Sequence, residues 1–310
     1  MFNGLLFFPI TPYTAEGDVD LAELAAHVKR GLDAGAGGVF VACGTGEFSA
    51  LEPGEYGDVV AAAVETVGGR VPVFAGAGGP VRTARNFTDR AAAAGASGVL
   101  VLPPYLTEAT GRGLEAYVRA ATSDDLPAIV YNRANARFSE SSAVAVARLP
   151  QVIGFKDGAG DLDLMIRIVR AVRDAGTNPS FLFFNGMPTA EVTQRAYRAI
   201  GVPLYSSAAF AFAPKVALAY YDALERDDTE TLAKLERAFY HPLARLRAKV
   251  TGYAVSLIKA GVELVGHSSG GVRPPLTAVA PAHRAELASI LSAGLAAVPA
   301  SGGPVSGGEA

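Results

Sequence analysis

Short runs of consecutive apolar residues alternate with longer amphipathic segments along most of the chain. Eight of these runs have the length and near-continuous hydrophobicity of parallel strands that are covered on both faces. We expect the eight strands at residues 5–10, 39–43, 71–75, 99–102, 128–131, 152–156, 181–185 and 202–206.

The segments between these runs have helical patterns. Residues 21–33, 54–67 and 162–174 are amphipathic or alanine-rich. Asp20 is suited to cap the first of these helices, because its carboxylate can accept from free amides of the first turn. Pro53 is suited to the first position of the second, where its missing N–H costs nothing.

A weak internal repeat supports the alternation of strands and helices. The strings DAGAGGVFV at 33–41 and AAGASGVLV at 93–101 share the order of helix end, glycine turn and next strand. Eight such units within about 225 residues predict an α/β fold, a closed (β/α)₈ TIM barrel. An open doubly wound sheet is less favoured, since no glycine-rich turn follows the first strand.

Beyond the eighth unit the pattern is purely helical. We expect these helices at residues 214–225, 229–249, 254–262 and 283–295. The prediction is therefore one domain with a helical appendage and a tail. The barrel, the C-terminal helical extension and the flexible tail are assigned to residues 1–225, 226–298 and 299–310.

Composition narrows the class of protein. Half of the residues are apolar, 18% are charged and the net charge is −3, which is typical of a soluble globular enzyme and gives no support to nucleic-acid or membrane binding. The apolar N-terminus stops at Pro9 and lacks a basic start, so we interpret it as a strand and not as a signal peptide. The single cysteine, Cys43, favours a reducing, cytoplasmic setting.

Polar residues and glycines follow the predicted strands. The active sites of such barrels lie at this end. The residues in question are Thr11, Gly44, Thr45, Gly46, Glu47, Gly76, Gly78, Tyr105, Tyr131, Asn132, Lys156, Asp157, Asn185, Gly186, Ser206 and Ser207.

Lys156 is the most informative member of this set. It alone among the six lysines ends an apolar strand, in the string VIGFKDGAGD. One interpretation is a structural lysine that pairs with Asp157 or another carboxylate. The other is an amine whose pKa is lowered from ~10.4 toward ~7–8 by burial, so that it can attack a carbonyl.

Two further features admit both a catalytic and a structural interpretation. Tyr131 ends the preceding strand, where its phenol can shuttle protons for an amine nucleophile or simply bond to the barrel rim. The turn CGTGE at 43–47 can bind a carboxylate through its amides and the Thr45 hydroxyl, or be an ordinary loop.

The histidines argue against two other chemistries. None of His27, His241, His267 and His283 ends a predicted strand, and none forms a spaced pair typical of zinc ligation. A Ser-His-Asp triad and a zinc-dependent aldolase are therefore disfavoured, as is a nucleotide-dependent enzyme, since no nucleotide-binding fingerprint is present. We expect amine catalysis with no metal and no organic cofactor.

With these residues placed, the chain resembles the dihydrodipicolinate synthase / N-acetylneuraminate lyase family over nearly its whole length. The loop at 43–47 matches the family's Gly-Thr-Thr-Gly-Glu turn, and Lys156 in GFKDGAGD matches its Schiff-base lysine. The pair Tyr131-Asn132 matches its Tyr-Asn. The chain departs from the pattern at Gly44, where the family has a threonine that relays protons to the tyrosine. The arginine that often follows the Tyr-Asn pair in the family does not align cleanly here and corresponds to Arg133 or Arg137.

Further strings are similar to the branch of the family that couples dehydration to decarboxylation. They include FFNGMPTAE, YSSAAFAF and GYAVSLIKAG. The resemblance implies a lyase acting on a deoxy keto-sugar diacid, with Lys156 forming the imine and Tyr131 moving protons. It implies a homotetramer as well. For substrate binding we predict Gly44, Thr45, Gly46, Asn132, Arg133, Asn185, Gly186, Ser206 and Ser207.

Three other functions remain as alternatives. A pyruvate-dependent aldolase, or dihydrodipicolinate synthase itself, would use the same lysine, although Gly44 argues modestly against both. A sugar-acid sensor on the same scaffold would not need an amine nucleophile. A phosphosugar enzyme would need a glycine-rich anion loop after the seventh or eighth strand, and the sequence has none there.

Overall fold

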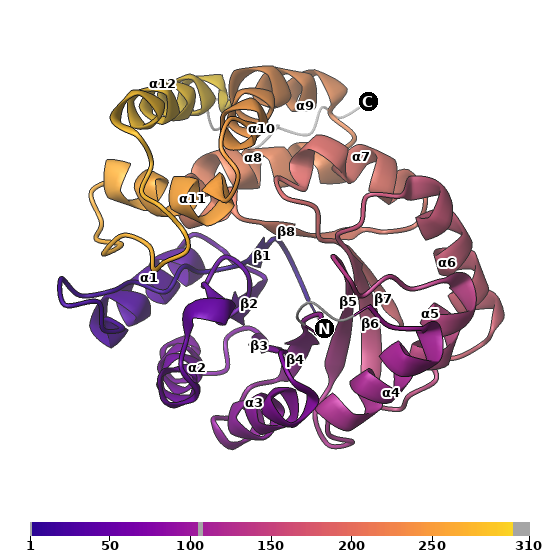
Figure 1. The fold of residues 1–310 in the computed structure, drawn as a ribbon. Coiled ribbons are helices and arrows are strands. Elements are labelled where there is room, and N and C mark those ends of the chain that lie inside the picture. The colour runs from indigo at the N-terminus through magenta and orange to yellow at the C-terminus, as the bar shows by residue number, and fades with distance from the viewer. Residues whose placement is uncertain (1, 105–107, 300–310) are drawn as a thin grey trace, which may run out of the picture.

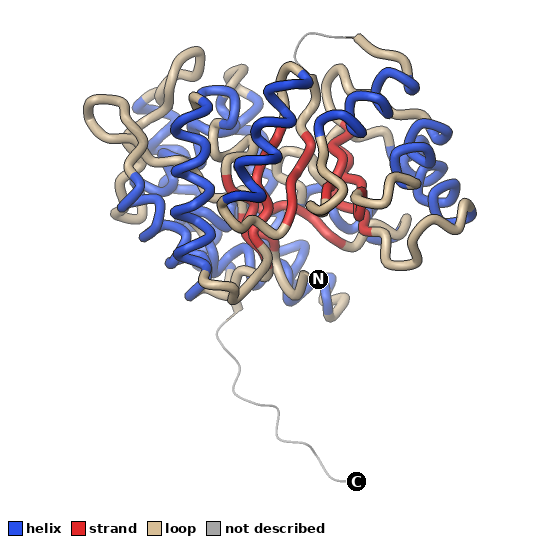
Figure 2. The backbone as a smooth tube through the Cα atoms, turned by 90° about the horizontal axis from the view of Figure 1, so that it is seen from below, coloured by secondary structure: helices blue, strands red, loops and turns tan. Residues whose placement is uncertain are grey.

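Eight parallel strands close into a barrel in the computed structural model, which describes residues 2–104 and 108–299. Each strand pairs with its neighbours in sequence, and β8 pairs with β1. Figure 1 looks along the barrel, and Figure 2 shows the strands from the side with helices around them. The strands are β1 (Leu6–Phe7), β2 (Gly38–Val41), β3 (Val73–Ala77), β4 (Gly98–Val101), β5 (Ala128–Asn132), β6 (Val152–Asp157), β7 (Leu182–Asn185) and β8 (Leu204–Ser207).

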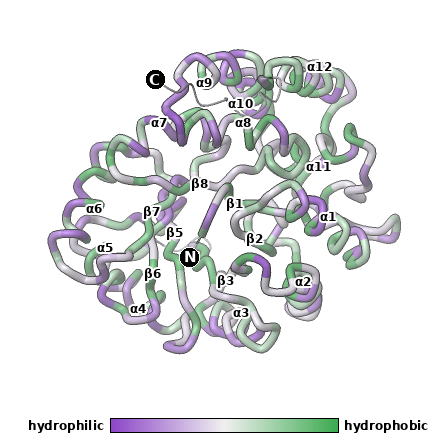
Figure 3. Tube along the Cα trace, turned by 180° about the vertical axis from the view of Figure 1, so that it is seen from behind, coloured by the Kyte–Doolittle hydropathy of each residue, from purple (hydrophilic) through white to green (hydrophobic). Residues whose placement is uncertain are grey.

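A helix follows each strand and covers the outside of the barrel (Figure 1). Along these helices hydrophobic and hydrophilic positions alternate, which is visible as changing colour in Figure 3. The helices are α1 (Leu21–Asp33), α2 (Pro53–Val67), α3 (Val81–Ala93), α4 (Gly111–Ala121), α5 (Glu140–Ala147), α6 (Leu162–Asp174), α7 (Glu191–Ala199) and α8 (Pro214–Glu225).

The predicted barrel is confirmed, and the predicted helix starts have the expected physical cause. The carboxylate of Asp20 accepts from the amide of Glu23 at 2.9 Å and caps α1. Pro53 occupies the first turn of α2, where no intrahelical partner for its N–H is needed. The strands differ from the predicted runs by at most three residues at their ends, because apolar runs continue into buried loops.

Side chains along each strand alternate between two separate apolar clusters. One cluster lies inside the barrel and includes Leu6, Phe40, Phe74 and Ile129. The other lies between the strands and the helices and includes Phe155. The residue that follows an inward-facing one therefore faces the helices, and this alternation decides which strand-end residues can reach a substrate.

Phe2 closes the end of the barrel at which the strands begin. Its ring centroid lies 5.6 Å from that of Phe40, 5.3 Å from that of Phe74 and 5.8 Å from that of Phe184. Aromatic pairs at these separations are favourable and fill the space between the strands. The site described below consequently opens at the other end.

The remaining helices form a group beside α8, at the upper left of Figure 1. The chain runs from α9 through a π-helical turn into α10 without leaving helical geometry, and Pro242 lies in the first turn of α10, just after the wider turn. A proline cannot donate to the preceding turn, and a π turn accommodates this. These elements are α9 (Thr229–Leu235), η3 (Glu236–Tyr240), α10 (His241–Ala248), α11 (Tyr253–Leu264) and α12 (Pro281–Ala297).

Two predictions fall on parts of the chain that the structure leaves out. Tyr105 lies outside the described residues, as does the predicted tail beyond Pro299. Among the helices of the described ranges, none is both long enough and apolar enough to cross a membrane.

Candidate active site

Lys156 projects into the barrel from the C-terminal half of β6. It pairs in register with Tyr131 on β5 and with Phe184 on β7. Its side chain is only 4% exposed, and its Nζ lies 4.1 Å from the centre of the Phe8 ring and 4.8 Å from that of Tyr131. The amine thus lies in an aromatic pocket.

The pKa of Lys156 is lowered from its ordinary value to about 7, chiefly by burial; Cys43 opposes this shift, and the charge of Arg133 adds to it. No carboxylate among the described residues forms an ion pair with the amine. Asp157, which the sequence offered as a possible ion-pair partner of Lys156, faces the helices instead. A large fraction of the amine is therefore neutral near pH 7 and can act as a nucleophile.

Tyr131 lies beside the amine with its phenol held on two sides. Its Oη donates to the carbonyl oxygen of Gly186 at 2.7 Å and accepts from Nη1 of Arg133 at 2.9 Å. Burial raises the pKa of Tyr131, and the adjacent guanidinium of Arg133 opposes that rise. The phenol is positioned to give or take a proton next to Lys156.

Gly186 must be a glycine because it packs directly on the two reactive side chains. A Cβ at this position would lie 2.6 Å from Cε of Lys156 and 2.8 Å from Cε2 of Tyr131. Its own polar groups bond within the protein, since its N–H donates to the backbone carbonyl of Asp157. Gly186 therefore shapes the pocket.

The loop after β2 has free amides at the same end of the barrel. The amides of Glu47 and Phe48 donate to the carbonyls of Gly44 and Cys43, whereas those of Thr45 and Gly46 bond to no acceptor among the described residues. A short 3₁₀ turn, η1 (Phe48–Ala50), follows the loop, and α2 begins later, so the amides belong to the loop and not to a helix terminus.

A buried ion pair fixes this loop. Glu47 has a left-handed φ of 52°, and its carboxylate lies 2.5 Å from Nζ of Lys259 on α11, with both side chains almost wholly buried. The second carboxylate oxygen accepts from the amide of Arg273 at 3.0 Å. The C-terminal helices thus hold the β2–α2 loop in place.

Ser206 and Ser207 on β8 face opposite ways. Ser206 pairs with Leu6, faces the barrel interior and is partly exposed, which leaves its hydroxyl available to a bound molecule. Ser207 is fully buried on the helix side, where its hydroxyl donates to Oε1 of Glu191 at 2.5 Å. The expectation that Ser207 contacts substrate is not supported by this orientation.

Asn132 and Asn185 also face the helices, and this orientation does not support the prediction that they bind substrate. Nδ2 of Asn132 donates to Asp157 at 2.7 Å, and its carbonyl accepts from the amide of Phe138. Nδ2 of Asn185 donates to Oε1 of Gln194 at 3.0 Å, and its carbonyl accepts from the amide of Met187. Both amides stabilise the turns that follow their strands.

Phe8 and Cys43 line the pocket although they were not among the predicted site residues. Both belong to the interior cluster that includes Tyr131. Burial raises the pKa of the Cys43 thiol to about 12, and the nearby Lys156 opposes this. The period-2 alternation within the apolar run 5–10 was the signal that could have identified Phe8.

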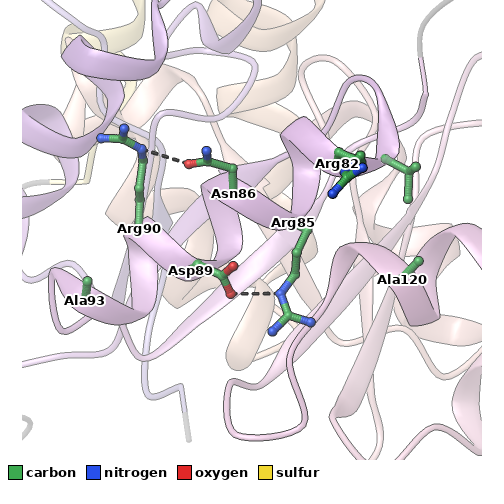
Figure 4. A pocket seen from close by; sticks show the side chains of 8 residues that line it. Arg82, Arg85, Asn86, Asp89, Arg90, Ala93 and Ala120 are labelled. Carbon is green, nitrogen blue, oxygen red and sulfur yellow. Dashed lines mark hydrogen bonds and ion pairs between the residues drawn. The ribbon is translucent and has the colours of Figure 1, made fainter.

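A separate hollow of about 790 Å³ lies outside the barrel, along α3 (Figure 4). Arg85 and Arg90 line it and bond to Asp89 and Asn86 on the same helix. The hollow contains none of the site residues. Within the described residues no group of three or more His, Cys, Asp or Glu side chains is placed to hold one metal ion.

Relatives of this chain share its length and architecture. It is 53% identical to a protein named probable 5-dehydro-4-deoxyglucarate dehydratase from Streptomyces griseus, over 94% of this chain and 92% of the relative. It is 51% identical to one named probable 5-dehydro-4-deoxyglucarate dehydratase 1 from Streptomyces coelicolor, over 94% and 93%. The crystal structure of dihydrodipicolinate synthase from Oceanobacillus iheyensis is similar with a TM-score of 0.85 at 28% identity, covering 94% and 96%.

The model of the dihydrodipicolinate synthetase family matches residues 1–294. This match spans the barrel and the C-terminal helices, and it agrees with the fold. The chain is therefore a member of the dihydrodipicolinate synthetase family.

Proposed function

We propose that this protein is a Schiff-base lyase that converts 5-dehydro-4-deoxy-D-glucarate to 2,5-dioxopentanoate, water and carbon dioxide. The observation that carries the proposal is the buried Lys156 amine, which has no carboxylate partner and lies against Tyr131. The names of the relatives, each over nine-tenths of this chain, supply the substrate. The lysine alone would suit several keto acids.

The reaction begins when Lys156 attacks the C5 ketone. Tyr131 assists loss of water from the carbinolamine, and the resulting protonated imine acidifies the C4 protons because it accepts their electrons. Loss of one C4 proton gives an enamine, which expels the C3 hydroxyl as water. The product of this half-reaction is an imine conjugated through a C3=C4 double bond.

The conjugated imine then accepts the electrons of the C1–C2 bond. Carbon dioxide leaves, and the C2 enol is protonated at C3 and becomes the aldehyde. A second protonation at C4 restores the imine, and hydrolysis frees Lys156. The balance for the dianionic substrate is one proton consumed and one molecule each of water, carbon dioxide and product anion formed. The imine is the electron sink for both eliminations, so this sequence requires no metal or organic cofactor.

The binding roles follow from orientation within the site. The free amides of Thr45 and Gly46, with the Thr45 hydroxyl, suit the carboxylate beside the ketone. Ser206 faces the interior and suits a substrate hydroxyl. Gly44 leaves open space beside the loop, since a Cβ there would meet nothing within 4 Å.

The physiological setting is part of the same proposal. We place the enzyme in D-glucarate catabolism, in the cytoplasm, and as a homotetramer. The substrate named for the relatives supports the role in glucarate catabolism. The single buried cysteine is compatible with the cytoplasm, and family resemblance suggests the homotetramer.

Borohydride trapping tests the proposal. The protein is incubated with 5-dehydro-4-deoxyglucarate, reduced and digested, and the adduct is located by peptide mass spectrometry. We expect a reduced adduct on Lys156 and stoichiometric carbon dioxide release in unreduced samples. An adduct elsewhere, or none, would contradict the mechanism, and faster turnover of pyruvate with an aldehyde would show an aldolase.

A further inference from the structure

Arg247 belongs to α10, in the C-terminal helical group, yet its guanidinium contacts the catalytic end of the barrel. Its Nη1 donates to Oγ1 of Thr189, in the loop between β7 and α7. The same loop begins with Gly186, whose carbonyl accepts from the phenol of Tyr131. A four-residue segment thus connects the Arg247 side chain to the reactive tyrosine.

Arg133, which directly follows β5, contacts the same tyrosine. Its guanidinium contacts the Tyr131 phenol and lies 5.8 Å from the centre of that ring. Arg133 is followed by Ala134, whose left-handed φ of 51° turns the chain back over the end of β5. The β7–α7 loop is therefore flanked by guanidinium groups from two distant parts of the sequence.

Neither guanidinium has a carboxylate partner within the described ranges. All ion pairs of the described residues are formed by other side chains, and neither Arg133 nor Arg247 takes part in one. The nearby acid, Glu191, is buried and accepts from Ser207. Burial lowers the pKa of Arg247, the charge of Arg133 lowers it further, and only Glu191 opposes them.

Arg247 is partly buried and Arg133 is exposed, and two neighbouring cations repel each other unless an anion joins them. We propose that Arg247 and Arg133 bind the distal carboxylate of the substrate, and that Arg247 sets the preference for dicarboxylic over monocarboxylic keto acids. The inference rests on the proposed function, because it assumes that the ketone end lies at Lys156. Guanidinium groups suit this task through paired hydrogen bonds to both carboxylate oxygens.

The arrangement also fits the course of the reaction. The distal carboxylate is the group that leaves as carbon dioxide, which is neutral. Its loss removes the anion that the two guanidinium groups hold, so the shorter product is bound less tightly than the substrate. The C-terminal helices then complete the active site and do more than pack against the barrel.

A pair of keto acids with the same functional groups up to the distal end tests the proposal. One is 5-dehydro-4-deoxyglucarate, and the other is 2-dehydro-3-deoxygluconate, which has a CH₂OH group in place of that carboxylate. The half-saturating concentration for borohydride trapping on Lys156 is measured for both acids with Arg247→Gln. The matched control is Arg245→Gln, on the same helix and exposed to solvent.

We expect Arg247→Gln to raise the half-saturating concentration of the dicarboxylate about 10- to 100-fold, the effect of losing a charge-assisted hydrogen bond. The monocarboxylate should change less than twofold, and Arg245→Gln should change neither. Equal changes for both acids would show a structural role and overturn the proposal, as would no change for the dicarboxylate.

A second variant protects the test against misfolding. Thr189→Val keeps the charge of Arg247 but removes its anchor, and we expect it to weaken dicarboxylate trapping at least threefold without affecting the monocarboxylate. An unchanged ratio of the two acids in a folded Thr189→Val protein would count against the proposal. If wild-type protein is not trapped by the dicarboxylate at all, the proposed function fails instead.

Discussion

At the scale of single residues, the site depends on one buried amine that lacks a counterion. Burial holds the pKa of Lys156 near 7, and Phe8 and Tyr131 supply ring faces in place of a carboxylate. The pKa of this lysine is lower in the folded than in the unfolded protein. Such a lysine destabilises the fold at every pH below its unfolded pKa, where the unfolded chain holds the lysine proton more tightly.

Lys156→Met should therefore abolish activity and yet stabilise the protein. Below about pH 7 the wild-type fold carries the full cost of the buried charge, and that cost falls as pH rises from about 7 toward the unfolded value of 10.5. We expect Tm to rise by about 2–5 °C at pH 7 and the difference to shrink toward pH 10. Thermal melts across this range measure it, and a lower Tm for the variant would contradict the assignment.

Gly186→Ala should impair catalysis more than folding. The added methyl group would displace Lys156 or Tyr131 from their present contact, so kcat should fall by about tenfold or more, since small displacements of reacting groups are costly. The control is Gly54→Ala on α2, where a Cβ meets nothing within 4 Å. Equal kcat values for the two variants would show that the pocket tolerates the methyl group.

At the scale of elements, sequence patterns predict the strands and helices but not which strand-end side chains face inward. Lys156 and Asp157 are adjacent in sequence, but Lys156 lies in the pocket and Asp157 faces the helices. Asn132, Asn185 and Ser207 were predicted as binding residues because they end strands, and their orientation depends on a register that apolar runs do not reveal.

Arg247 was beyond sequence reasoning for a different reason. It lies on a helix about 90 residues after Lys156, and only the packing of the C-terminal helices brings it to the β7–α7 loop. Lys259 is similar: it lies within the predicted helix 254–262, and no sequence pattern shows that its side chain is buried against Glu47. Long-range packing of this kind leaves no local signal.

The Glu47–Lys259 pair joins two elements, and Glu47→Gln should expose its importance. The change leaves the Lys259 cation buried without an anion, so the free energy of unfolding should fall by about 3–5 kcal/mol. The double variant with Lys259→Met should recover much of the loss. Chemical denaturation measures both, with Glu115→Gln as a surface control, for which about 1 kcal/mol or less is expected. A loss no larger than this control would contradict the buried pair.

At the scale of the whole molecule, a chain of net charge −3 places the cations Arg133 and Arg247 near one site. A dianionic substrate is then attracted to the mouth of the barrel, and salt screens this attraction. We expect KM to rise several-fold between about 0.05 and 0.5 M ionic strength, with kcat nearly constant. Steady-state carbon dioxide release measures both constants, and a KM independent of salt would argue against electrostatic capture.

The aromatic floor around Phe2 has a consequence for which molecules can be substrates. Because Phe2 closes the barrel at the end where the strands begin, a substrate must enter from the other end. It enters with its keto end first and stops where Lys156 meets the carbonyl. Branches near the ketone then collide with fixed walls, while extra carbons at the far end extend toward bulk solvent. Acids one carbon longer should still form the imine, whereas acids alkylated next to the ketone should not.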